Sequence, residues 1–295
     1  MKVVKIAVTG ANGQLGSELG ELAENLPCCH FLFTDIDTLD ITDEDAVGTF
    51  LTREMPAFLV NCAAYTAVDK AEQEPDRAAL LNASGPLVLA RCCLSTGTRL
   101  LHISTDYVFD GTASIPYTEE DPVNPATVYG RTKREGEVNC LLNPDSLIIR
   151  TSWLYSRFGN NFVKTMLRLG KEKEKIRVVF DQVGTPTCAA DLAGVILKII
   201  MASVANPRYW KPGLYHFSNE GVCSWYDFAC AIFRMAGISC NVEPVESKDF
   251  LTLAIRPHFS VLNKSRFKSA FGLEIPYWMD SLEKCILWLK NEKRT

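Results

Sequence analysis

The sequence has little of what marks a membrane protein or a nucleic-acid-binding protein. It contains no uninterrupted apolar run of about 18 residues or more, the length that would predict a membrane-spanning helix. Its 31 Lys and Arg stand against 35 Asp and Glu, and no segment concentrates basic residues as a duplex-binding face requires. Residues 1–8 form a short apolar run that leads straight into a glycine-rich turn, unlike an export signal. We therefore expect a soluble, cytoplasmic protein whose partner is neither nucleic acid nor a membrane.

The spacing that metal ligands require is also missing. The 4 His and 11 Cys form no C-x-x-C or H-x-x-x-H pattern, and the adjacent pairs Cys28-Cys29 and Cys92-Cys93 do not have zinc-ligand spacing. An odd number of cysteines, scattered through apparent helices and strands of a chain this long, does not fit a disulfide framework. We expect reduced cysteines and no metal site.

Short β-branched runs alternate with longer helical stretches through the first half of the chain. Strands are predicted at residues 5–9, 30–34, 58–63, 99–104, 147–151 and 176–180. This alternation is typical of a doubly wound parallel sheet covered by helices on both faces. A helical stretch at 71–95 is interrupted by Gly85-Pro86, which predicts a bend or a restart there.

Beyond residue 180 the alternation becomes irregular. Loops are expected at 183–186, 206–213 and 256–258, and helices around 190–201, 225–236 and 279–291. At 295 residues the chain exceeds the roughly 100 to 200 residues of one domain. We therefore predict an α/β fold with a dinucleotide-binding domain mainly in residues 1–180 and a smaller C-terminal substrate-binding lobe mainly in 181–295, with the chain free to cross between them.

A glycine-rich turn follows the first predicted strand and opens the first predicted helix. It reads Gly10-Ala11-Asn12-Gly13-Gln14-Leu15-Gly16. In that position glycines let the backbone approach a pyrophosphate, whose charge lies against the N–H groups at the helix N-terminus. The turn therefore predicts a Rossmann-like dinucleotide site, and its G-x-x-G-x-x-G spacing resembles the short-chain dehydrogenases. The alternative is an ordinary glycine-rich turn.

The end of the second strand carries Asp35, in the region where a carboxylate would bind the adenosine ribose and repel a 2′-phosphate. This position favours NADH over NADPH, although Asp35 could also serve as a turn or cap residue. Asp40 and Ile41 lie close by in the chain and are included in the predicted cofactor site. Ala63-Ala64-Tyr65, after the third strand, offers small side chains for close backbone approach and completes that prediction.

Tyr129 and Lys133 are four residues apart and would share one helix face. A phenol has a pKa of about 10, so its proton exchange near neutrality needs a partner such as an ammonium group. Together the two side chains predict proton donation to a carbonyl during its reduction. Ser104-Thr105, at the end of the fourth strand, supplies a hydroxyl to hold the carbonyl oxygen, and periodicity leaves open which of the two does so. A Tyr–Lys pair alone is also common on helix surfaces.

Several motifs spread along the chain resemble the dTDP-4-dehydrorhamnose reductases. They are the glycine turn, Ser104-Thr105-Asp106-Tyr107-Val108-Phe109-Asp110-Gly111, Tyr129-Gly130-Arg131-Thr132-Lys133, Arg150-Thr151-Ser152-Trp153-Leu154-Tyr155, Gly159-Asn160-Asn161-Phe162, Asp181-Gln182-Val183-Gly184-Thr185-Pro186-Thr187 and Arg256-Pro257. The resemblance implies reduction of the 4-keto group of dTDP-4-dehydro-6-deoxy-L-mannose by NADH or NADPH, which yields dTDP-L-rhamnose for cell-surface polysaccharide.

The same resemblance implies roles for individual residues. Thr105 would polarise the keto oxygen, Tyr129 would donate the proton and Lys133 would assist it. Asp106, Trp153, Asn161 and Arg256 are the predicted substrate contacts. Trp153 could instead be a core aromatic residue, and Arg256 could be a surface residue.

Some members of this family bind magnesium through glutamates at a subunit contact, and a homodimer is therefore considered. Glu18 matches one such position, but Ala189 and Ala190 stand where another glutamate would be expected, which makes magnesium doubtful. Two other functions stay open. One is a regulatory subunit resembling the β-subunit of methionine adenosyltransferase, and the other is a different sugar-nucleotide reductase, epimerase or dehydratase.

Overall fold

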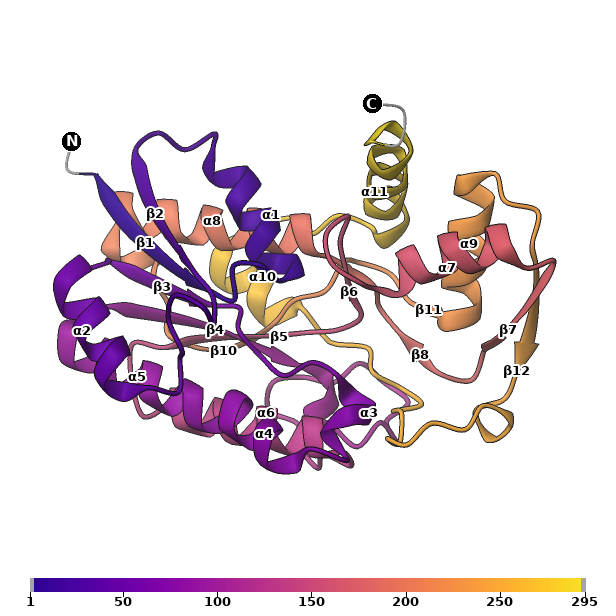
Figure 1. Ribbon diagram of the computed structural model, residues 1–295, viewed down its shortest axis with the longest axis horizontal. Helices are drawn as coiled ribbons and strands as arrows, with labels where there is room; N and C mark the ends of the chain where they lie inside the picture. Colours follow the sequence, from indigo (N-terminus) through magenta and orange to yellow (C-terminus); the bar gives the residue numbers. More distant parts are fainter. Residues whose placement is uncertain (1–2, 293–295) are drawn as a thin grey trace.

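A parallel six-stranded sheet forms the centre of the larger part of the molecule (Figure 1). The computed structural model describes residues 3–292. The strand order is β10-β5-β4-β3-β1-β2. The strands are β1 (Val4–Thr9), β2 (Cys29–Thr34), β3 (Phe58–Asn61), β4 (Arg99–Thr105), β5 (Leu147–Thr151) and β10 (Gly213–His216). Every neighbouring pair is parallel, which confirms the predicted doubly wound α/β fold.

Alternating side chains of each strand face two different helical layers. Ile6 and Val8 of β1 pack in one apolar cluster, whereas Ala7 between them packs in another. The first cluster lies under α1 (Gln14–Ala23), α8 (Ala189–Ala205) and α10 (Ser265–Phe271). The second lies under α2 (Glu44–Glu54), α5 (Gly85–Thr96) and α6 (Val128–Cys140). Both faces of the sheet are therefore buried, as parallel sheets require.

The predicted helical stretch at 71–95 consists of several short pieces, which are continuous only from Pro75 onward. It comprises α3 (Val68–Ala71), α4 (Pro75–Ala79), the π-helical turn η1 (Leu80–Ser84) and α5. Pro86 lies in the first turn of α5, directly after the π-helical turn η1. Within residues 3–292, one helical run (Pro75–Thr96) is apolar and long enough to cross a bilayer, and 56% of its most apolar window is buried inside the protein. Such burial is typical of a core helix of a folded domain.

A smaller part of the molecule lies beyond the carboxyl ends of the strands (Figure 1). Its main elements are α7 (Phe162–Glu172), β7 (Lys175–Val179), α9 (Trp225–Ala236), β12 (Asn241–Val245) and α11 (Trp278–Glu292). The short strands β6 (Leu154–Tyr155) and β9 (Thr187–Cys188) pair with each other, as do β8 (Val183–Gly184) and β11 (Cys223–Ser224). Single 3₁₀ turns occur at η2 (Asp106–Val108), η3 (Pro207–Tyr209) and η4 (Ser247–Asp249).

The strand predicted at 176–180 does not belong to the central sheet. It forms β7, which pairs with β12 in a separate two-stranded sheet. The sixth strand of the central sheet is instead β10, at the end of a segment expected to be a loop. β10 is only 4 residues long, too short for its sequence to display a period, and it is defined by its pairing with β5.

We propose that the chain divides near residue 180 into a larger domain and a smaller lobe, and that it crosses between the two. Three elements after residue 180, α8, β10 and α10, pack with the central sheet. Two elements before residue 180, α7 and β7, pack with α9 of the smaller part.

A buried ion pair joins α6 to the central sheet. Glu137 of α6 and Arg150 of β5 are 0% and 1% exposed, and Arg150 donates from Nε and Nη2 to the two carboxylate oxygens at 2.7 and 2.8 Å. Ser104 of β4 donates to the same carboxylate at 2.6 Å. The ion pair lowers the pKa of Glu137 although burial acts to raise it. Three elements are therefore held together by one carboxylate.

Replacing Glu137 by Gln is expected to destabilise the fold by about 3 to 5 kcal/mol, because Arg150 stays buried and loses its compensating charge. Chemical denaturation monitored by circular dichroism measures the loss. The matched control is Glu172→Gln, which removes the carboxylate of an exposed i,i+4 ion pair with Arg168 and should change stability by less than about 0.5 kcal/mol. Equal effects of the two substitutions would contradict the assigned role of the buried pair.

Candidate active site

Three adjoining cavities lie at the carboxyl ends of the strands. The central cavity, of about 490 Å³, is lined by the ends of β4 and β5, by α6 and by the glycine turn. The turn-side cavity, also about 490 Å³, shares Gly13, Cys62 and Ala64 with it. The lobe cavity, about 1000 Å³, shares Tyr107 with the central cavity and extends between α7, β7 and α9. Ligands of doubly wound sheets bind at this edge, where the strand order reverses beside β1.

The glycine turn fits a dinucleotide by its shape and by the uncapped N-terminus of α1. Gly10 has φ +67°, and a Cβ at this position would lie 2.5 Å from the backbone nitrogen of Ala63. A Cβ on Gly16 would lie 2.4 Å from the carbonyl oxygen of Gly10, so this glycine lets α1 pack closely on the turn. Gly13 is the N-cap of α1 and provides no capping side chain, while Gln14 and Leu15 line the central cavity. A helix N-terminus without a capping group suits a diphosphate.

The turn-side cavity brings together most of the predicted cofactor residues. Its lining includes Gly10, Asn12, Gly13, Asp35, Asp40, Ile41, Ala63 and Ala64. Asp35 accepts hydrogen bonds from the backbone nitrogens of Asn12 and Ile36 at 2.9 and 2.8 Å, which fixes its carboxylate beside the turn. Asp40 accepts from the backbone and hydroxyl of Thr42, the contacts of a local turn.

Two residues of the predicted cofactor set, Gly16 and Tyr65, lie outside the described linings of these cavities. Gly16 serves the packing of α1 instead. The hydroxyl of Tyr65 donates to Glu74 at 2.9 Å, and Arg77 lies over its ring. The backbone N–H and carbonyl of Tyr65 are both hydrogen-bonded to Asn82, and the cofactor contact predicted for Tyr65 stays a prediction.

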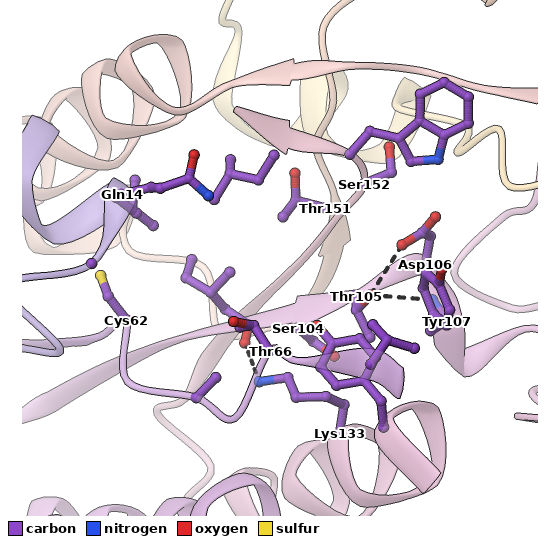
Figure 2. Close-up of a pocket in the computed structure, with 18 of the residues that line it drawn as sticks. Gln14, Cys62, Thr66, Ser104, Thr105, Asp106, Tyr107, Lys133, Thr151 and Ser152 are labelled. Carbon is purple, nitrogen blue, oxygen red and sulfur yellow. Dashed lines mark hydrogen bonds between the residues drawn. The ribbon is translucent and has the colours of Figure 1, made fainter. Parts of the chain in front are cut away.

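Tyr129 and Lys133 both line the central cavity from α6, as their spacing predicts. Tyr129 is half-buried, and burial raises the pKa of its phenol above the usual value, while the Thr105 hydroxyl acts in the opposite direction. Lys133 is only 2% exposed. Its Nζ donates to the carbonyl oxygen of Ile103 at 2.6 Å (Figure 2). Burial lowers the pKa of Lys133 to about 8.

The structure distinguishes the two hydroxyls that the sequence left open. Ser104 Oγ donates to Glu137 at 2.6 Å and is occupied by the buried ion pair. Thr105 Oγ1 lies 3.0 Å from Asp106 Oδ1 and accepts from the backbone nitrogen of Tyr107 at 3.2 Å (Figure 2). This geometry favours Thr105 as the hydroxyl available to a substrate. Its assignment as a catalytic group stays a prediction.

Asp106 is a buried carboxyl group on the wall of the central cavity. It is 2% exposed, and its Oδ2 has no hydrogen-bond partner among the described residues. Burial raises the pKa of Asp106 to about 7, against the opposing hydrogen bond of Thr105. A buried acceptor of this kind costs free energy unless a ligand satisfies it, which supports the predicted sugar contact.

Trp153 forms an aromatic wall between the central and lobe cavities. Its ring stacks on Trp225 of α9 with centroids 3.6 Å apart and planes inclined by 9°. Trp153 lines the central cavity and Trp225 lines the lobe cavity. The backbone of Trp153 has φ +48°, an uncommon value for a residue other than glycine, so local packing holds it in place. Sequence reasoning missed Trp225, because its helical spacing is equally typical of a core position.

The remaining predicted substrate residues lie at opposite ends of the site. Asn161 lines the central cavity, where its amide donates to Gln14 and to the carbonyl oxygen of Ser156 at 2.9 and 2.6 Å. Its oxygen accepts from the backbone nitrogen of Lys164 and caps α7. Arg256 lines the lobe cavity, pairs with Asp69 and donates to the hydroxyl of Tyr107 at 3.1 Å.

Three basic residues of the lobe cavity carried no signal in the sequence. They are Lys173, Lys175 and Arg177, which follow α7 and enter β7. In the sequence they stand in a mixed run of Lys, Glu and Arg, which is typical of a solvated surface. Only the tertiary structure places this segment beside Arg256.

The surroundings of Glu18 do not fit magnesium. Glu18 accepts from Ser156 Oγ at 2.6 Å, and the guanidinium of Arg157 lies 3.6 Å from its other oxygen. Arg157 also pairs with Glu21, so a cation already balances these carboxylates. Throughout residues 3–292, no group of three or more His, Cys, Asp or Glu side chains is arranged to hold a metal ion.

Comparison with known proteins identifies the family. Residues 4–290 match the RmlD substrate binding domain family. The dTDP-4-dehydrorhamnose reductase of Aggregatibacter actinomycetemcomitans is 41% identical over 288 residues, covering 95% of this chain and 98% of that protein.

Two crystal structures of reductases with the same name are closely similar. The one from Clostridium acetobutylicum has a TM-score of 0.92 and 45% identity, covering 97% of this chain and 100% of that chain. The one from Bacillus anthracis, in complex with NADP, has a TM-score of 0.91 and 41% identity, covering 98% and 100%. The glycine turn, the strand-end hydroxyls and the Tyr–Lys helix thus occur in a chain that belongs to the family of NAD(P)H-dependent dTDP-4-dehydrorhamnose reductases.

Proposed function

We propose that this protein reduces the 4-keto group of dTDP-4-dehydro-6-deoxy-L-mannose with NADH or NADPH and releases dTDP-L-rhamnose. The observation that carries the proposal is the arrangement of Thr105, Tyr129 and Lys133 around one cavity, between the glycine turn and the Trp153 wall. A binding protein resembling the methionine adenosyltransferase β-subunit would have no chemical reason to keep this arrangement.

The residues that would hold the cofactor are the glycine turn, Asp35 and Lys133. When bound, the reduced nicotinamide supplies the hydride for the keto carbon. The N–H groups at the start of α1 bind the diphosphate, and Asp35 receives the adenosine ribose. The fit rests on the uncapped helix and on the backbone approach that Gly10 permits.

Tyr129 is the proton donor in this proposal. Because burial raises its pKa, the phenol keeps its proton at neutral pH and acts as a general acid toward the keto oxygen. Thr105 orients that oxygen. The Thr105 hydroxyl donates to Asp106 Oδ1 at 3.0 Å and accepts from the backbone nitrogen of Tyr107, and these two contacts fix its position at the wall of the central cavity.

The substrate is held by an aromatic wall and a basic cavity. Trp153 offers an apolar face to the deoxyhexose, and the unpaired oxygen of Asp106 accepts from a sugar hydroxyl. The lobe cavity, with Lys173, Arg177 and Arg256, accommodates the nucleotide and its diphosphate. Asn161 closes the central cavity beside Gln14.

We further propose a preference for NADH. The described lining of the turn-side cavity contains two carboxylates, Asp35 and Asp40, and one guanidinium, Arg77, which already pairs with Glu74. A 2′-phosphate placed there would meet the Asp35 carboxylate at close range, which costs free energy.

The proposed function also has a cellular setting. We propose that the protein works in the cytoplasm, possesses no nucleic acid or membrane partner, forms a homodimer and provides an activated sugar for cell-surface polysaccharide.

Replacing Tyr129 by Phe is expected to lower kcat by about 10²- to 10⁴-fold, because the general acid is lost while the cavity keeps its shape. The assay follows NADH absorbance with dTDP-4-dehydro-6-deoxy-L-mannose, and NADH binding is measured in parallel by fluorescence. The control Tyr277→Phe removes an exposed phenol and should leave kcat unchanged. Sugar-dependent turnover that survives in Tyr129→Phe would rule out Tyr129 as the donor. Absence of turnover in the unaltered protein would argue for a different substrate.

Replacing Asp35 by Ala is expected to raise kcat/KM for NADPH relative to NADH by about tenfold or more, because one close repulsive charge is removed. Steady-state kinetics with each cofactor measure this ratio. The control Asp37→Ala alters an exposed carboxylate two residues away and should leave the ratio unchanged. An unchanged ratio in Asp35→Ala would show that this carboxylate does not select the cofactor.

A further inference from the structure

A buried chain of polar side chains crosses the sheet edge and ends on Lys133. It consists of Thr9 of β1, Asn61 of β3, His102 of β4 and Lys133 of α6, which are 1%, 1%, 0% and 2% exposed. Each side chain lies within hydrogen-bond distance of the next one. Thr9 is 2.8 Å from Asn61 at one end, and His102 is 3.3 Å from Lys133 at the other. Buried polar groups at such a position need partners, so each donor and acceptor can be assigned.

The side-chain amide of Asn61 can adopt only one orientation. Its Oδ1 accepts from the backbone nitrogen of Ala63 at 3.1 Å, and a backbone N–H can only donate. The Thr9 hydroxyl lies 2.8 Å from the same oxygen. The Asn61 amide nitrogen therefore faces His102 Nδ1, at 2.9 Å, and donates to it. Consequently Nδ1 of His102 must be the unprotonated nitrogen of the ring.

The proton of a neutral His102 is then on Nε2, which faces Lys133. Burial lowers the pKa of His102 well below its usual value, so the ring is neutral at physiological pH. Its Nε2–H lies 3.3 Å from Lys133 Nζ. An ammonium group there would oppose donor to donor, whereas a neutral amine accepts this hydrogen bond and still donates to the Ile103 carbonyl oxygen at 2.6 Å.

We propose that His102, oriented by Asn61, is a positioning residue that favours the neutral amine form of Lys133 in the cofactor-free protein. The amine lone pair is directed to Nε2–H of His102, and an N–H of Lys133 is directed to Ile103. The negatively charged dinucleotide would favour the ammonium form instead, so its binding and the protonation of Lys133 are coupled. The inference rests on the proposed function for its catalytic meaning, but the protonation states it assigns are testable without substrate.

Other groups that face Lys133 raise its pKa and therefore act against the effect of His102. Glu137 and Cys140 on α6 and Cys62 after β3 all favour the charged lysine. Arg150 and Arg134 already compensate Glu137, and burial raises the pKa of both thiols to about 12, so both thiols are neutral at physiological pH. Burial outweighs these groups and lowers the pKa of Lys133 to about 8, in the direction that the hydrogen-bond pattern requires.

Asn61→Asp reverses the polarity of the chain with almost no change of shape. A carboxylate keeps the acceptor for Ala63 and Thr9, but it requires a donor from His102, so the ring proton moves to Nδ1. Nε2 then accepts from Lys133, which stabilises the ammonium form. We expect the pKa of Lys133 to rise by about one unit or more.

Two measurements on the protein without sugar test the proposal. Long-range ¹H–¹⁵N NMR of the histidine rings should show His102 neutral and protonated on Nε2 from pH 6 to 9, and protonated on Nδ1 in Asn61→Asp. NADH affinity, followed by fluorescence as a function of pH, should weaken as the pH rises past the pKa of Lys133. In the variant this weakening should occur about one pH unit higher. Asn25→Asp, which adds an exposed carboxylate, is the matched control and should change neither result.

A His102 ring protonated on Nδ1, or an imidazolium, in the unaltered protein would overturn the proposal. So would an unshifted binding profile in a folded Asn61→Asp variant. Should that variant fail to fold, the NMR result on the unaltered protein decides alone. Failure of the proposed reductase activity would leave both measurements unaffected, so the two proposals can fail separately.

Discussion

The arrangement of the site depends on one buried carboxylate. Glu137 binds Arg150 of β5 and Ser104 of β4, and it lies on the same helix as Tyr129 and Lys133. Because a buried charge tolerates only a partner with the right geometry, the contact fixes where α6 meets the sheet. The same contact occupies the Ser104 hydroxyl and leaves that of Thr105 beside the cavity. The ion pair thus positions α6 and separates the roles of two adjacent residues.

Burial determines the proton chemistry of the site as strongly as its geometry does. Burial raises the pKa of the Tyr129 phenol and lowers that of the Lys133 ammonium to about 8, so in each group it acts in favour of the neutral form. Asp106, with a pKa of about 7, follows the same rule. The pKa values of Asp106 and Lys133 therefore lie close to neutrality, where a nearby charge can change the protonation state of either group.

Each part of the molecule contributes a different kind of contact to the site. The central sheet supplies the glycine turn, the hydroxyls and the polar chain through Asn61 and His102, all at the carboxyl ends of parallel strands. The smaller part supplies Trp225 and the basic residues of the lobe cavity. The stacked pair Trp153 and Trp225 lies where these contributions meet. The site is therefore lined by residues from both parts of the molecule.

The sequence alone determined the features that depend on neighbouring residues. The glycine turn after β1, the spacing of Tyr129 and Lys133 and five of the six strands of the sheet were predictable, because local periodicity and turn chemistry encode them. Only the tertiary structure decided the sixth strand β10, the different hydrogen-bond partners of Ser104 and Thr105, the stacking of Trp225 and the partners of His102. Each of these is defined by a partner distant in the chain, and no local pattern records which residue that partner will be.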